Sequence, residues 1–226
     1  MTHADSTLAP TRIIDSDHPA VIAFAATHRG AGSPREQAVR LYYAVRDEIR
    51  YDPYSIVLSE QGLSASQALG WGRGWCVSKA ALLAACCRAS GIPARVGFAD
   101  VKNHLSTERM RATMQTDEFV YHGYTLIGLE DRWVKATPAF NLSLCEKFRI
   151  KPLEFDGTTD SLYHPFDLDG RQHMEYLRYR GEYDDVPFTD IVATFNEVYA
   201  HMLATLAGGD FEQEVARETA SLARAG

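Results

Sequence analysis

The stretch from Trp71 to Arg95, WGRGWCVSKAALLAACCRASGIPAR, decides the fold because it joins a predicted helix to a predicted strand. Its middle is apolar on nearly every side, which is typical of a buried helix. Gly91 and Pro93 are expected to end that helix, and an alternating strand pattern follows. A thiol, Cys76, stands at the helix start, directly after a turn rich in Gly and Trp.

A thiol in the first turn of a helix lies near the positive end of the helix dipole. The unpaired backbone N–H groups there favour the thiolate, which is the nucleophilic form of cysteine. Gly72 and Gly74 would let the backbone come close to a bound substrate. The alternative is that Cys76 is one more small core residue, which is what we expect of Cys86 and Cys87 on the same helix.

The remaining pattern runs from helices to strands and back to helices. Three helices are expected before Cys76, at 18–28, 33–51 and 63–72, with Asp17 or Ser16 capping the first and Ser33 beginning the second with a capping box. Strands are expected at 94–100, 119–129 and 132–137, the last two as an antiparallel hairpin around Glu130 and Asp131. Residues 141–186 lack clear periodicity, and two helices at 187–206 and 211–224 close the chain. This order predicts an α+β fold with one domain over residues 1–226.

Composition narrows the possible functions. The chain has 226 residues with a formal charge of −7, so nothing indicates a nucleic-acid partner. No apolar run is long enough to span a membrane, and the N-terminus does not resemble a signal peptide, so we expect a cytoplasmic protein. The four cysteines form no C-x-x-C pair. Residues 154–173 collect Asp and His side chains, but their spacing fits no EF-hand or helical zinc motif, so we expect no metal and no cofactor there.

A nucleophilic cysteine needs a base, and His122 is the candidate. It lies within a predicted strand whose other residues are aromatic or apolar, and Gly123 after it leaves space beside the imidazole. A histidine in such a strand can also be an ordinary core residue.

Two segments resemble the transglutaminase-like superfamily: GRGWCVSKAALLAACCRASGIPARVGF and YHGYTLIGLEDRWVKATPAF. The resemblance covers residues 35–142, which leaves 143–186 as an irregular flap and 187–226 as C-terminal helices. It implies a papain-like fold, with the nucleophile at the start of a helix that packs on an antiparallel sheet. Carried over, Cys76 is the nucleophile and His122 the general base. The family normally orients that histidine with an Asp on the next strand.

The third catalytic residue departs from the family pattern, because Thr137 stands where the family has the Asp. If residue 129 pairs with 132 in the hairpin, His122 faces position 139, and Thr137 is its diagonal neighbour on the same face. Asp100, at the end of the strand 94–100, is the best replacement, although an Asp there is also typical of a turn. Asp117 and Asn141 are the other candidates.

The resemblance implies acyl transfer through a Cys76 thioester on an amide, peptide or acyl-thioester substrate. The acceptor would be water in a hydrolase or an amine in a transglutaminase-type enzyme. The alternatives are a thioester-cleaving cyclase acting on a carrier-bound chain, and a catalytically inactive binding scaffold. The backbone N–H of Cys76 is expected to be one oxyanion donor, and the second could come from the side chains of Trp71, Trp75, Tyr51 or Tyr54. The oligomeric state stays open.

Overall fold

The computed structural model describes residues 5–103, 106–162, 167–170, 174–200 and 209–225, with side chains up to residue 220. In chain order its elements are α1 (Pro19–Arg29), α2 (Pro34–Glu48), β1 (Arg50–Tyr51), η1 (Pro53–Ser55), α3 (Glu60–Leu63), α4 (Ala65–Trp71), β2 (Arg73–Gly74) and α5 (Cys76–Ala89). They continue with β3 (Ala94–Asn103), α6 (Glu108–Met114), β4 (Glu118–Leu129), β5 (Arg132–Ala136), α7 (Leu142–Phe148), β6 (Met174–Tyr183), α8 (Phe188–Val198) and α9 (Phe211–Ala225). The expected α+β class is confirmed.

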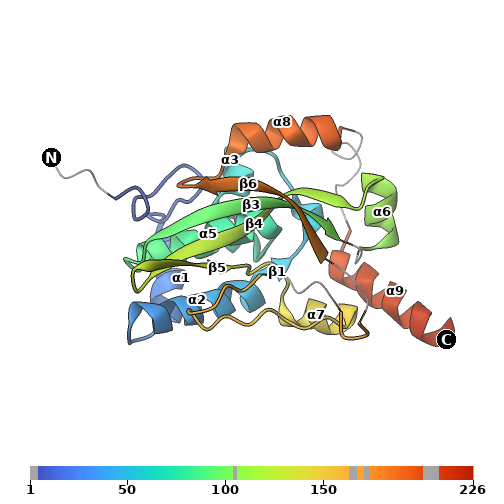
Figure 1. Ribbon diagram of the computed structural model, residues 1–226, viewed down its shortest axis with the longest axis horizontal. Coiled ribbons are helices and arrows are strands. Elements are labelled where there is room, and N and C mark those ends of the chain that lie inside the picture. Colours follow the sequence, from blue (N-terminus) through green and yellow to red (C-terminus); the bar gives the residue numbers. More distant parts are fainter. Residues whose placement is uncertain (1–4, 104–105, 163–166, 171–173, 201–208, 226) are drawn as a thin grey trace.

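A four-stranded antiparallel sheet in the order β5-β4-β3-β6 forms the centre of the molecule (Figure 1). Helix α5 packs on β4 and β3, and α1, α2 and α4 surround the rest of α5. Every residue of α5 from Cys76 to Arg88 is buried, as its uniformly apolar sequence predicts. The nucleophile candidate therefore lies at the end of the most deeply buried helix.

The β4–β5 hairpin has the predicted register. Leu129 pairs with Arg132, and the turn residues Glu130 and Asp131 both have positive φ (49° and 65°). Two residues with positive φ in a two-residue turn match the right-handed twist of the flanking strands. The paired residues reach Thr125 and Ala136, so the register, continued by three residues, places His122 alongside the chain just beyond the end of β5.

Several local predictions hold and some are wrong. Ser33 caps α2 with the expected capping box, whereas His18, not Asp17 or Ser16, caps α1. Residues 141–186 are less irregular than expected, because they contain α7 and the ten-residue strand β6. Strand β3 continues to Asn103. The short helix α6 has no counterpart among the predicted elements.

The end of α5 is anchored by Arg88, whose side chain is buried. Its guanidinium donates hydrogen bonds to the carbonyl oxygens of Ala94 (3.0 and 2.8 Å), Ala9 (2.6 Å) and Asp184 (2.6 Å). These bonds tie the helix to the start of β3, to the N-terminal segment and to the chain after β6.

We expect Arg88→Met to lower the free energy of unfolding by about 3 kcal/mol, because buried carbonyl groups would lose their donors. Urea denaturation measures this change. Arg12→Met is the matched control: Arg12 pairs with Glu60 at the surface, with 81% of its side chain exposed, and should change stability by less than about 0.5 kcal/mol. Equal losses in the two variants would contradict the anchoring role.

Candidate active site

Cys76 is the first residue of α5, as predicted. The two-residue strands β1 and β2 pair in parallel just before it, with Tyr51 opposite Gly74. A Cβ atom on Gly74 would lie 2.5 Å from the Ser78 hydroxyl oxygen, so only glycine lets this strand approach the helix start. The Ser78 hydroxyl accepts a hydrogen bond from the Trp75 N–H (3.1 Å). The glycine-rich turn thus packs against the start of the helix that carries the thiol, and Ser78 of that helix binds the turn.

Strand β4 passes close to the same helix end. A Cβ atom on Gly123 would lie 3.1 Å from both the Cys76 carbonyl oxygen and the Val77 Cα. The space beside His122 that Gly123 was expected to leave is therefore filled by the backbone of α5. The close approach also brings the Gly123 backbone within hydrogen-bonding range of the Cys76 thiol.

Cys76 and His122 line one small cavity of about 30 Å³. Both residues are buried, with 6% and 5% of their surface exposed. The structure therefore brings together the two residues that the sequence singles out as nucleophile and base. The rest of the wall comes from five segments, through Tyr51, Pro53, Ile56, Trp75, Met110, Met114, Phe119, Val120, Phe195 and Tyr199.

Burial controls the charge of both groups. It raises the pKa of the Cys76 thiol to about 12, although the backbone groups of Gly123, Val77 and Cys76 itself lower that pKa. It lowers the pKa of His122 to about 3. The helix start does favour the thiolate as expected, but desolvation outweighs it in this closed state. At neutral pH the site therefore holds a protonated thiol and a neutral imidazole.

Asp100 lies within β3, not in a turn as one alternative had it. Its neighbour Ala99 pairs with His122 across the sheet. Both Asp100 oxygens accept hydrogen bonds from Arg180 of β6 (2.7 to 2.9 Å), and Oδ1 also accepts the Tyr121 N–H (3.0 Å). Tyr121 has a φ of 54°, at an irregularity of the β3–β4 pairing. Asp100 thus holds the backbone immediately before His122.

The other candidates for the third catalytic residue have different surroundings. Asp117 forms an ion pair with Lys102 (3.0 Å). The Asn141 side-chain oxygen accepts the Tyr51 N–H (2.9 Å). The hydroxyl oxygen of Thr137, at the family's Asp position, is buried and makes no hydrogen bond within the described part of the chain. Asp117 and Asn141 are therefore each bound to another residue, whereas the Thr137 hydroxyl has no hydrogen-bond partner among the described residues.

The structure separates the candidate oxyanion donors. Trp71 is 41% exposed, and the Tyr54 hydroxyl bonds to Thr107 (2.8 Å), while Tyr51 and Trp75 line the cavity. The indole N–H of Trp75 is buried and has no hydrogen-bond acceptor among the described residues. Trp75 therefore combines a place at the thiol with an available donor, and Tyr51 is the other of the four side chains that lines the cavity.

Sequence reasoning missed the residues that cover the site. Met110 and Met114 belong to α6 and Phe195 to α8, and Tyr199 is the C-cap residue of α8. Each pair is spaced by four residues, which places both members on one helix face. The spacing of four residues in the sequence indicates that the two side chains of each pair share a helix face. It does not indicate which part of the protein that face covers.

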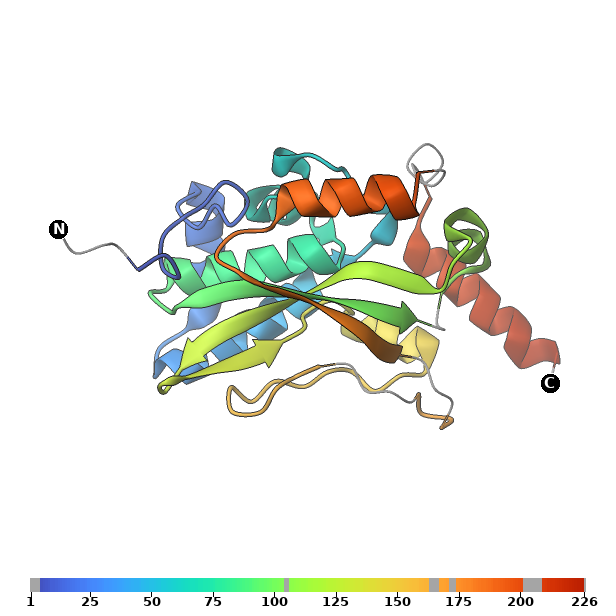
Figure 2. The same ribbon diagram turned by 45° about the horizontal axis from the view of Figure 1, so that its top comes forward.

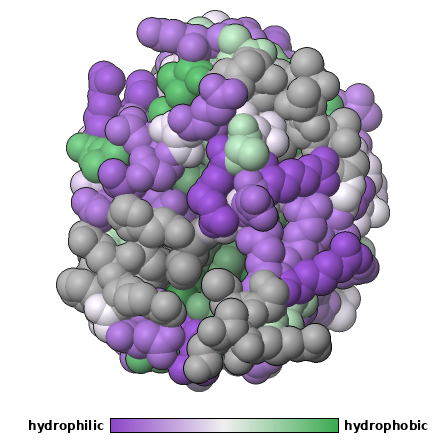
Figure 3. Space-filling view, turned by 90° about the vertical axis from the view of Figure 1, so that its right-hand side faces the viewer, coloured by the Kyte–Doolittle hydropathy of each residue, from purple (hydrophilic) through white to green (hydrophobic). Residues whose placement is uncertain are grey.

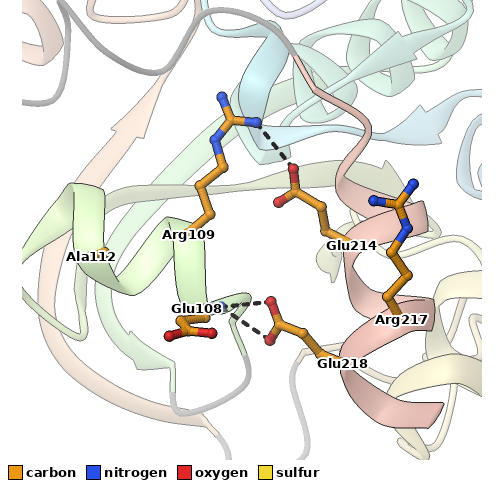
Figure 4. Close-up of a pocket in the computed structure, with 6 residues that line it drawn as sticks. All are labelled: Glu108, Arg109, Ala112, Glu214, Arg217 and Glu218. Atoms are coloured by element: carbon orange, nitrogen blue, oxygen red, sulfur yellow. Dashed lines mark hydrogen bonds and ion pairs between the residues drawn. The ribbon is translucent and has the colours of Figure 1, made fainter. Parts of the chain in front are cut away.

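Helix α6 is held from its other side by α9 (Figures 2 and 4). Both carboxylate oxygens of Glu218 accept the backbone N–H of Glu108, at 2.9 and 3.0 Å. Arg109 pairs with Glu214 (3.0 Å), and Arg111 lies 3.9 Å from Glu218. The surface on this side of the molecule is mostly hydrophilic, with hydrophobic side chains at the bottom of a hollow (Figure 3). Charged contacts thus join the cover to the C-terminal helix.

The described residues contain neither a cluster of metal ligands nor a membrane-spanning helix. No group of three or more His, Cys, Asp or Glu side chains there could hold a metal ion; part of the segment 154–173 lies outside those residues. No helix in the described part of the chain is long and apolar enough to cross a membrane.

The solved structures similar to this chain include a candidate cysteine protease and a candidate protease. The chain is 16% identical to one from Cytophaga hutchinsonii, with a TM-score of 0.45, covering 78% of this chain and 53% of that one. It is 15% identical to a candidate protease from Parabacteroides distasonis, with a TM-score of 0.38, covering 63% of this chain and 28% of that one. The chain thus spans about half or less of their length.

No curated protein matches the chain. The sequence does match the transglutaminase-like superfamily over residues 22–138, which is more than half of its 226 residues and includes Cys76, Asp100 and His122. This chain therefore belongs to the transglutaminase-like superfamily.

Proposed function

We propose that this protein is a cysteine enzyme that transfers acyl groups through a thioester on Cys76. The observation that carries the proposal is the cavity in which Cys76, at a helix start, and His122 meet. Membership of the superfamily supports a thiol-dependent hydrolase or acyltransferase. The substrate would be an amide, a peptide or an acyl thioester, and the acceptor water or an amine.

The reaction begins with neutral groups. As the Cys76 sulfur attacks the carbonyl carbon, the His122 ring takes the thiol proton. The oxyanion that forms accepts hydrogen bonds from the Cys76 backbone N–H and the Trp75 indole N–H. Collapse expels the amine or thiol leaving group, which takes the proton back from His122. Water or an amine then attacks the thioester, His122 takes its proton and returns it to the Cys76 sulfur, and the acid or new amide is released.

Acyl-enzyme trapping tests this proposal. We expect p-nitrophenyl acetate to place an acetyl group on Cys76, located by peptide mass spectrometry. His122→Gln should slow the labelling at least about 100-fold. Cys145→Ser, which removes another buried thiol, is the control and should label Cys76 at the normal rate. If Cys76 takes up no acetyl group, or takes it up equally fast without His122, the proposed enzyme is wrong.

A catalytically inactive scaffold is the second candidate, and Thr137 favours it because no carboxylate stands at that position. We propose instead that Asp100 is a positioning residue, acting on His122 through the Tyr121 backbone and through its ion pair with Arg180. The scaffold predicts no acetyl transfer at all in the trapping experiment.

The Asp100–Arg180 pair makes an electrostatic prediction. Arg180 lies 4.8 Å from the ring centre of Tyr121, the residue before His122. Asp100→Asn would leave this cation without its carboxylate, and an uncompensated positive charge opposes protonation of the imidazole. The acid limb of the pH–rate profile for Cys76 acylation should then move to lower pH. Arg180→Met leaves the carboxylate uncompensated and should move that limb to higher pH. A loss of rate in both variants with unmoved limbs would mean that the pair is merely structural.

A further inference from the structure

We infer that the acyl group accepted by Cys76 is apolar and carries no charge, an inference that rests on the proposed function. The composition of the cavity wall supports this inference. Apart from Cys76 and His122, the residues lining the cavity are aliphatic, aromatic or methionine, and no Asp, Glu, Lys or Arg side chain of the described chain is among them.

Besides Cys76 and His122, this wall has three side chains with a polar atom: Tyr51, Tyr199 and Trp75. The Tyr199 hydroxyl accepts the Val120 N–H (2.9 Å) and donates to the Glu118 carbonyl (2.6 Å). The Trp75 indole N–H remains as a donor beside the thiol, which suits a carbonyl oxygen. The wall therefore has a partner for the reacting end of the substrate and apolar surface for the rest.

Charged groups beside this wall pair with one another, including Asp52, which stands between Tyr51 and Pro53 and pairs with Arg73 (3.2 Å). Asp100 is bound by Arg180, and Glu214 by Arg109 and by the Tyr54 hydroxyl (2.5 Å). An acyl chain with a carboxylate would have to bury its charge without a counterion, which is costly in an apolar site.

The present cavity has room for about one water molecule, so an acyl chain must displace part of the wall. Met110 and Met114 are the side chains best suited to move, because methionine is unbranched and adapts to irregular shapes. They belong to the seven-residue helix α6, which α9 holds through partly exposed ion pairs. Such pairs contribute little to stability, so displacing α6 is a small change compared with opening the core.

The test compares two thioesters of N-acetylcysteamine that share one leaving group, hexanoyl and glutaryl, whose acyl chains are similar in size. In each case the Cys76 sulfur forms a bond to the acyl carbon, the bond to the cysteamine sulfur breaks, and the thiol proton passes through His122 to the departing cysteamine. We expect the hexanoyl group to reach Cys76 about 100-fold faster than the glutaryl group, measured by intact-protein mass spectrometry.

A charge added to the wall should change this preference. Met114→Lys supplies a counterion inside the cavity, and we expect the ratio of hexanoyl to glutaryl rates to fall at least about tenfold. Leu142→Lys adds the same charge on α7, where the side chain is 42% exposed, and should leave the ratio unchanged. The ratio for the native protein decides the inference even if Met114→Lys does not fold.

The outcomes separate the two proposals. Equal rates for the two thioesters, or a faster glutaryl transfer, overturn the inference about the acyl group while leaving the acyl-transfer mechanism in place. If no thioester and no ester acylates Cys76, the proposed function fails, and the inference with it.

Discussion

Iodoacetamide should alkylate Cys76 of the free protein at least about 1,000-fold more slowly at pH 7.5 than it alkylates an exposed thiol. Only the thiolate reacts, and the thiolate fraction falls about tenfold for each unit by which the pKa is raised. Burial raises the pKa of Cys76 to about 12, against an ordinary value near 8.5. We therefore expect the rate to rise with pH without a plateau near neutrality.

Mass spectrometry of peptides from the labelled protein identifies which thiol has reacted, with Cys76→Ala as the control. All four cysteines are buried, so the native protein should show slow labelling at each of them. A rate that levels off below pH 7 would instead show a thiolate–imidazolium pair already formed in the free protein. That result would contradict the closed, neutral state described above.

Acid should destabilise the protein through His122. Its pKa is about 3 in the folded state, where burial opposes the charged ring, and near 6.5 in the unfolded chain. Between these values the unfolded chain binds a proton that the folded protein does not, so the free energy of unfolding falls as the pH is lowered from 6.5 toward 3. The loss approaches 1.4 kcal/mol for each pH unit, about 5 kcal/mol in all.

Urea denaturation at a series of pH values from 7 to 4 measures this effect. His122→Gln has no proton to take up, so its stability should depend less steeply on pH in this range. The comparison is between slopes, so a uniform loss of stability in the variant does not affect it. Parallel curves for the two proteins would show that His122 is accessible to water or already charged when folded.

The features that sequence predicted best depend on neighbouring residues. The apolar run after Cys76 predicts a buried helix because no exposed face is possible, and Glu130 and Asp131 set the hairpin register through the turn alone. That register predicts that Thr137 lies on the same side of the sheet as His122. The fold class and the candidates for nucleophile and base followed from such local signals.

The features that sequence missed depend on contacts between distant residues. Strand β6 lies at one edge of the sheet, and Tyr179 on it is 60% exposed, so its sequence lacks the apolar alternation of a half-buried strand. Without β6 there was no reason to pair Asp100 with Arg180, which lies 80 residues later. Helix α6, with seven residues, is too short for a periodic pattern to stand out.

If α6 must move for the proposed acyl transfer, its ion pairs with α9 make ionic strength a variable of that reaction. Access to the thiol is then a pre-equilibrium, and the observed rate is the intrinsic rate multiplied by the fraction of molecules in which α6 has moved away. Dissolved salt screens partly exposed charges over about 10 Å at 0.1 M, which weakens the hold of α9 on α6. Moderate salt should therefore speed turnover in this protein, whereas an attraction between a charged substrate and its enzyme would be weakened by it.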